Sequence, residues 1–291
     1  MAESVAQTFG SDWTEIKLDA LTDYISQWNK ILSKYPYFKR VYIDAFAGSG
    51  EREQNGKVHL GSPLRVMSLN AFDEYHFIDG NSTNCDSLRS HFESRTGQDV
   101  HIYHDDANKW IKEHISDFNW SKTRGIMFLD PFAMQLDYNT LEQIAEQTTG
   151  LDLWMLFPAS ALIRTLPRKS YPLQDWWPTL NRFWGDESWR EFYKEEEESL
   201  FNFDYTGAEG EDPLAYETVI ARQSHMDILK GYRSRLEKIF PAVCGDFGML
   251  QHRNHLLFLL IFVTTAPKPS SQGAAMNIAK HLIKAINTPS L

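Results

Sequence analysis

The sequence has few cysteines, from which disulfide frameworks and many zinc sites are built. It contains two cysteines, Cys85 and Cys244, and neither has another Cys or His at metal-ligand spacing. We therefore expect no disulfide framework, no metal and a reducing, cytoplasmic environment. The longest apolar run, Leu256 to Val263, is too short to span a bilayer, so we expect a soluble protein without membrane contact.

Positive charge is also scarce, since the formal net charge is -10 at pH 7. Non-specific binding of long nucleic acid needs a clustered excess of Lys and Arg, so the balance argues against a generally basic surface, although a local patch is still compatible with it. One short basic cluster, Arg164, Arg168 and Lys169, follows a predicted strand. It is open to two interpretations, a solvated loop and a phosphate contact.

Apolar segments alternate with helical patterns along most of the chain. Strands are expected at 40–46, 75–79, 100–103, 125–130 and 151–157, and helices at 12–34, 62–69, 81–94, 107–115 and 140–146. Strands separated by helices imply right-handed crossovers, so the fold class is α/β with a mainly parallel, doubly wound, Rossmann-like sheet. Residues 248–265 suggest an antiparallel closing hairpin, and a final helix follows.

The chain is expected to form one domain over residues 1–291. Residues 1–40 form an N-terminal helical segment, and the alternation is interrupted at 159–240 by a helical insertion with a turn-like segment at 207–213. The insertion is rich in tryptophan, namely Trp176, Trp177, Trp184 and Trp189. These side chains are either part of a lid or substrate platform or ordinary core residues.

The strongest local motif follows the first predicted strand, at the sheet edge where ligands bind in such folds. It comprises Asp44, Phe46, Ala47, Gly48, Ser49 and Gly50. Glycines let a ligand approach the backbone closely, and the Asp44 carboxylate suits the cationic amino group of an amino-acid moiety. A dinucleotide fingerprint needs a third glycine where Glu53 stands and a helix directly after it, whereas the next helix begins only near Ser62. S-adenosylmethionine therefore fits the motif better than NAD.

Two further strand ends supply candidate cofactor contacts. Asp79, followed by Gly80 and Asn81, is placed to accept hydrogen bonds from both ribose hydroxyls. The third strand leads into Asp105, Asp106 and Ala107, where a carboxylate can accept the adenine amino group. The alternative is that one of these two aspartates only caps the following helix.

The fourth strand ends at Asp130, Pro131 and Phe132, which are the candidate catalytic residues. Asp130 and a nearby carbonyl can hold the hydrogens of an exocyclic amino group and orient its lone pair, while Phe132 stacks on the ring. Alternatively, Asp130 is a turn residue at the strand end and Phe132 belongs to the core. Four successive strand ends bearing acids favour the functional interpretation.

At these residues the sequence resembles the three-Cys-motif partner (TcmP) family of bacterial methyltransferase-like proteins. The resemblance covers WTEIKLDALTDYI, YIDAFAGSG, GSPLRVMSL, HFIDGN, LDPFAMQLDY, DLWMLFPAS and NHLLFLLIFVT. It implies a class I methyltransferase fold that binds S-adenosylmethionine and a partner protein with a three-cysteine motif. The Asp-Pro-Phe segment is also similar to motifs of amino-methylating nucleic-acid enzymes, although Ala133 replaces a glycine and a second proline is absent.

Three hypotheses for function follow. The first is methyl transfer from S-adenosylmethionine to an exocyclic amino group of a nucleic-acid base, in RNA or DNA, without a metal. The second is a cofactor-binding but non-catalytic partner of a three-cysteine-motif protein. The third, an NAD-dependent oxidoreductase, is weakened by Glu53.

Overall fold

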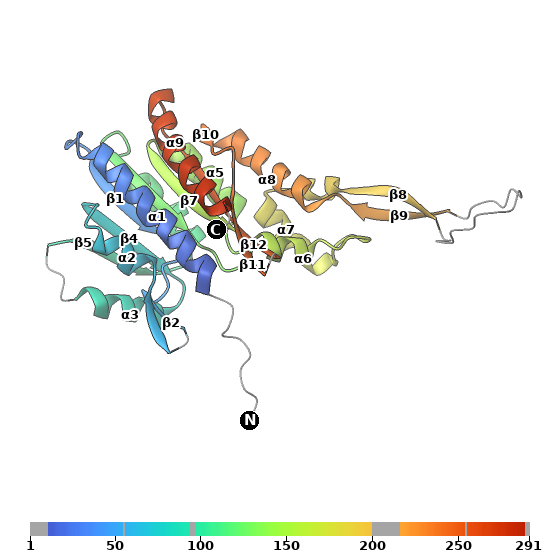
Figure 1. Ribbon diagram of the computed structural model, residues 1–291, viewed down its shortest axis with the longest axis horizontal. Helices are drawn as coiled ribbons and strands as arrows, with labels where there is room; N and C mark the ends of the chain where they lie inside the picture. Colours follow the sequence, from blue (N-terminus) through green and yellow to red (C-terminus); the bar gives the residue numbers. More distant parts are fainter. Residues whose placement is uncertain (1–10, 55, 94–96, 200–215, 254, 289–291) are drawn as a thin grey trace, which may run out of the picture.

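The computed structural model describes residues 11–54, 56–93, 97–199, 216–253 and 255–288 (Figure 1). None of the helices in these ranges combines the length and the apolar composition that a membrane span requires.

Five parallel strands form the centre of the main sheet. In spatial order they are β5 (Asp99–His104), β4 (Glu74–Asp79), β1 (Lys39–Asp44), β6 (Thr123–Leu129) and β7 (Leu151–Phe157). The chain runs outward from β1 through β4 to β5 and then returns to the other side of β1 with β6. This change of direction places a topological switch point between β1 and β6, where doubly wound sheets bind their ligands at the carboxyl ends of the strands.

The sheet is completed by antiparallel strands at one side. The strand β12 (His255–Thr264) pairs antiparallel with β7, and both β10 (Ala242–Val243) and β11 (Gly248–His252) pair antiparallel with β12. The predicted doubly wound α/β sheet with an antiparallel closing hairpin is therefore confirmed. Arg253, which has a φ of +47°, follows β11 at the hairpin tip, while Asn254 lies outside the described residues.

Helices cover both faces of the sheet. Alternate side chains of β1 belong to different cores, because Tyr42 packs in one cluster while Val41 and Ile43 pack in the other. The Tyr42 face is covered by α1 (Ser11–Leu32), α2 (Ser62–Ser68), α3 (Ser82–Phe92) and α9 (Pro269–Asn287). The Val41 face is covered by α4 (Ala107–His114), the 3-10 turn η1 (Ile115–Asp117) and α5 (Tyr138–Gln147).

Residues 159–240 contain helices and also a β-ribbon that the sequence pattern does not predict. The helices and 3-10 turns are α6 (Ala159–Thr165), η2 (Gln174–Trp176), α7 (Trp177–Trp184), η3 (Glu187–Phe192) and α8 (His225–Ile239). The strands β8 (Tyr193–Ser199) and β9 (Tyr216–Arg222) pair antiparallel and extend away from the main sheet (Figure 1). Trp184 and Trp189 are buried in the core, whereas Trp176 is 44% exposed. The predicted turn at 207–213 lies outside the described residues.

A second small hairpin lies beside the first crossover. It pairs β2 (Glu51–Gln54) with β3 (Lys57–Leu60) and occupies the stretch between the glycine-rich loop and α2. Arg52 and Arg65 both form ion pairs with Glu15 of α1. These contacts hold the start of α1 close to the glycine-rich loop.

Candidate functional site

Acidic residues stand at the carboxyl ends of four neighbouring parallel strands. Asp44 and Asp79 are the last residues of β1 and β4, and Asp105 and Asp130 directly follow β5 and β6. The register aligns Asp44 with Phe77 of β4 and with Phe128 of β6. Because these strands are parallel, the four acids that the sequence singles out lie at one edge of the sheet, around the switch point.

Asp44 is fully buried. Its Oδ1 accepts a long hydrogen bond from the Phe46 N–H (3.4 Å), and its Oδ2 accepts one from the Tyr42 hydroxyl (3.3 Å). Burial, together with the nearby charge of Asp130, raises the pKa of Asp44 to about 7, although the hydrogen bonds from Ser62, Phe46 and Tyr42 lower it in part. Asp44 therefore exchanges its proton near neutral pH.

Asp79 holds the glycine-rich loop against the sheet. Its Oδ2 accepts a hydrogen bond from the Gly48 N–H (2.8 Å), and its Oδ1 accepts two more, from the Asn81 N–H (2.8 Å) and from Nδ2 of Asn84 (3.0 Å). The Ala47 N–H donates to the Ile78 carbonyl (2.9 Å), also across the β1 and β4 ends. The loop and the second strand end therefore form one hydrogen-bonded unit.

The loop presents backbone to open space. Gly48 has a φ of +65°, and a Cβ placed there would meet nothing within 4 Å. Gly50, with a φ of +85°, is instead packed, since a Cβ there would lie 3.0 Å from Leu88. The Gly50 carbonyl accepts the Gly61 N–H (2.6 Å), and the Ser49 hydroxyl donates to the Glu51 carbonyl (2.6 Å). The open side of the loop is therefore at Gly48.

The two adjacent aspartates at the end of the third strand make different contacts. Asp106 caps α4, because its Oδ1 accepts the Lys109 N–H (3.0 Å). Asp105 pairs through both oxygens with the Lys109 ammonium, at 3.0 and 3.1 Å. Ala107 begins α4 and is buried, and the Gly80 carbonyl lies 3.2 Å from Nε2 of His104. The capping alternative thus describes Asp106, and contact with an adenine ring stays a prediction for Asp105.

The fourth strand end combines a paired carboxylate with an exposed ring. Phe132 is 81% exposed, so it does not belong to the core. Its N–H donates to Oε1 of Gln135 (3.2 Å), and the next residue, Ala133, has a φ of +52°. This left-handed conformation favours glycine, which is the residue found here in the amino-methylating motifs that the segment resembles. The segment turns sharply and presents the Phe132 ring to solvent.

Lys17, which the sequence analysis did not single out, joins this site from α1. Its ammonium forms an ion pair with Asp130 and lies 4.8 Å from the centre of the Trp13 ring, while its side chain is only 5% exposed. Lys17 stands one helical turn before Leu21, on the apolar stripe of α1. A lysine on the buried face of a helix is the sequence signal that could have identified it.

The basic cluster lies near this segment. The helix α6 begins directly beyond the carboxyl end of β7, and its Thr165 hydroxyl contacts the sulfur of Met134 (4.0 Å). Arg164, Arg168 and Lys169 are exposed at and beyond the end of α6. Positive charge is therefore displayed beside the Asp130–Phe132 segment.

Comparison with known proteins gives distant structural similarity only. No protein-family model and no curated protein matches the sequence. A Legionella pneumophila protein of known structure is similar at 10% identity over 94% of each chain, with a TM-score of 0.44. An S-adenosylmethionine-dependent methyltransferase from Clostridium acetobutylicum is similar at 11% identity, over 84% of this chain and 91% of that chain, with a TM-score of 0.39. Matches this distant assign no family, so the resemblance to the three-Cys-motif partner family stays a prediction.

Proposed function

We propose that this protein is an S-adenosylmethionine-dependent methyltransferase that acts on an exocyclic amino group of a nucleic-acid base. The observation that carries the proposal is the hydrogen bond from the Gly48 N–H to Asp79, which joins the glycine-rich loop to an acid at the switch point. Open space beside Gly48 leaves room for a ligand to approach the backbone.

The acidic residues at the strand ends suit a cationic nucleoside better than a pyrophosphate. Asp44, Asp79 and Asp105 are all acids, and acids repel a phosphate group but attract an amino group and accept hydroxyl hydrogens. The loop also leads into the β2–β3 hairpin instead of a helix N-terminus, which a dinucleotide site requires. The loop therefore lacks the helix N-terminus that NAD binding requires, which argues against the oxidoreductase hypothesis.

The fourth strand end provides the acceptor side of the proposed reaction. S-adenosylmethionine, when bound, supplies an electrophilic methyl group and leaves as S-adenosylhomocysteine. Asp130 would accept a hydrogen bond from the base amine and so orient its nitrogen lone pair, water would take the proton that the methylated nitrogen releases, and the exposed Phe132 ring would stack on the base. The exposed basic cluster next to this segment suits the phosphates that flank the base.

A methyl-transfer assay tests the proposal. Purified protein is incubated with methyl-labelled S-adenosylmethionine and with total RNA, DNA or protein as acceptor. We expect label in a nucleic-acid fraction, and we expect Asp130→Asn to lose most of this activity while its cofactor affinity is unchanged. Full activity in that variant, or label only in protein, would contradict the proposal.

One observation favours the second candidate, a non-catalytic partner of a three-cysteine-motif protein. Asp130 is already paired through Oδ2 with the buried Lys17, which offsets its charge and makes it a weaker acceptor for an amine. The same assay distinguishes the candidates when it is repeated with a three-cysteine-motif protein present. Cofactor binding without label in any fraction, with or without that partner, would favour the non-catalytic role.

A further inference from the structure

Strands β4 and β5 bring two histidines and two acids together at the amino ends of the strands, at the end of the sheet opposite the glycine-rich loop. Glu74 and His76 project from one face of β4, and the register places Asp99 beside Glu74 and His101 beside His76. The two imidazole rings stack with their centres 4.9 Å apart. The four side chains thus form a compact group near the amino ends of the two strands.

The ligand atoms of three of these residues converge. Oε1 of Glu74 lies 3.1 Å from Nε2 of His76 and 3.3 Å from Nε2 of His101, and the three atoms all lie within 4.8 Å of one another. Two donors bound to zinc at about 2.0 Å with tetrahedral geometry are themselves about 3.3 Å apart. These two distances therefore match the spacing of ligands around one zinc ion.

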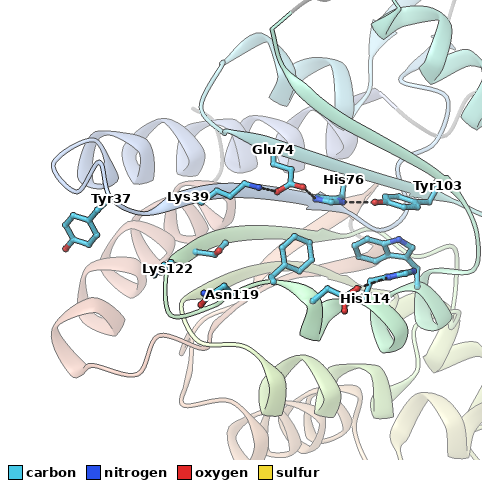
Figure 2. Close-up of a pocket in the computed structure, with 12 residues that line it drawn as sticks. Tyr37, Lys39, Glu74, His76, Tyr103, His114, Asn119 and Lys122 are labelled. Carbon is cyan, nitrogen blue, oxygen red and sulfur yellow. Dashed lines mark hydrogen bonds and ion pairs between the residues drawn. The ribbon is translucent and has the colours of Figure 1, made fainter.

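Nε2 of His76 points into this group and has no hydrogen-bond partner among the residues that the structure describes. His76 is only 5% exposed, and its Nε2 makes no hydrogen bond with Glu74 although the atoms are close. Its other ring nitrogen, Nδ1, lies 3.3 Å from the Tyr103 hydroxyl (Figure 2). A histidine ligand characteristically has one nitrogen on the metal and the other held by a neighbouring polar group.

We propose that Glu74, His76 and His101 bind a divalent transition-metal ion, with zinc as the best fit to two imidazoles and one carboxylate. His101 has a side chain that is 40% exposed on the edge strand β5, so it can rotate to close the coordination.

The surroundings leave an open position for water or a small ligand. Glu74 and His76 line a cavity of about 580 Å³ together with Tyr103, Trp110 and His114 (Figure 2). Lys39 forms an ion pair with Oε2 of Glu74, which leaves Oε1 directed at the histidines. The metal therefore faces the cavity and not the protein core. This inference does not depend on the proposed methyl transfer, because Glu74 begins β4 while Asp79 ends it.

The test measures zinc binding to the tag-free full-length chain after treatment with a chelator. Equilibrium dialysis should give one zinc ion per chain. His101→Ala and Glu74→Gln should each weaken zinc binding more than 100-fold. Tyr103→Phe removes only a neighbour of a ligand and should weaken binding by roughly 10–100-fold. The matched control is His114→Ala, because His114 lines the same cavity but lies outside the cluster. It should bind zinc as the wild type does.

A second measurement reports the ligands directly. Co²⁺ bound in place of zinc should give visible absorption that is present in the wild type and in His114→Ala and is absent in His101→Ala. Circular dichroism confirms that each variant is folded, which is expected because His101 and Glu74 lie at strand positions near the edge. Absence of stoichiometric binding, or equal binding by the His101 and His114 variants, would overturn the proposal.

Discussion

The ion pair between Lys17 and Asp130 yields a prediction that separates the structural role of Asp130 from its proposed catalytic role. The Lys17 side chain is 5% exposed and that of Asp130 is 26% exposed. In Asp130→Ala the ammonium of Lys17 loses its partner while it stays buried. In Lys17→Met the charge is removed and the remaining carboxylate is still reached by water.

The expected magnitudes follow from this asymmetry. Removing one partner of a buried pair costs about 3–5 kcal/mol, and the partial exposure of Asp130 places Asp130→Ala at the lower end, about 3 kcal/mol. Lys17→Met should cost about 1 kcal/mol, because methionine fills the apolar stripe of α1. The double variant should be more stable than Asp130→Ala alone, since it buries no unpaired charge.

Urea denaturation of the four proteins, followed by circular dichroism, gives the coupling free energy, which we expect to be about 2 kcal/mol. The control is Asp86→Ala, because Asp86 is 73% exposed and pairs with Arg89 one turn away. That variant should change stability by less than about 0.5 kcal/mol. If Asp130→Ala were no more destabilising than this control, or equally destabilising with and without Lys17, the reasoning would be refuted.

Three further predictions concern the same edge of the sheet. Because the pKa of Asp44 is raised to about 7, the folded protein retains a proton that the unfolded chain releases. Between about pH 4 and pH 7 the free energy of unfolding of the wild type should therefore fall by roughly 4 kcal/mol relative to that of Asp44→Asn. Parallel plots of unfolding free energy against pH for the two proteins would contradict this. Gly48→Ala should lower the free energy of unfolding by about 1–2 kcal/mol, because Gly48 has a φ of +65°. The same variant should bind S-adenosylmethionine more weakly in calorimetry. Unchanged affinity would place the ligand elsewhere. Phe132→Ala should change the free energy of unfolding by less than about 0.5 kcal/mol, because the ring is 81% exposed. It should lower kcat/KM for nucleic acid by an amount that corresponds to about 1–3 kcal/mol of activation free energy. Unchanged kinetics would argue against stacking.

The central sheet could be predicted from the sequence because its strands are apolar runs that end at turn residues. The run from Val41 to Asp44 and the run from Leu151 to Phe157 are buried along their length, as strands covered on both faces must be. The hairpins β2–β3 and β8–β9 could not be predicted in this way. The segments Glu51–Gln54 and Tyr193–Ser199 are polar or strongly acidic, so they lack the alternation that marks a strand buried on one face.

The candidate site was predictable where it depends on strand ends and not where it depends on tertiary placement. Asp44, Asp79 and Asp130 follow apolar runs, and parallel strands necessarily bring them to one edge. Lys17 becomes part of the site only because α1 crosses that edge. The group of Glu74, His76 and His101 depends on the register between β4 and β5, which single-strand patterns do not determine.

The most direct test of the account is calorimetric titration of the wild type and of Asp79→Ala with S-adenosylmethionine and with NAD. We predict one S-adenosylmethionine site per chain, no measurable NAD binding, and a loss of at least tenfold in affinity for Asp79→Ala, which corresponds to about 1.4 kcal/mol. Binding of NAD, or S-adenosylmethionine affinity unaffected by removal of the Asp79 carboxylate, would contradict the central claim.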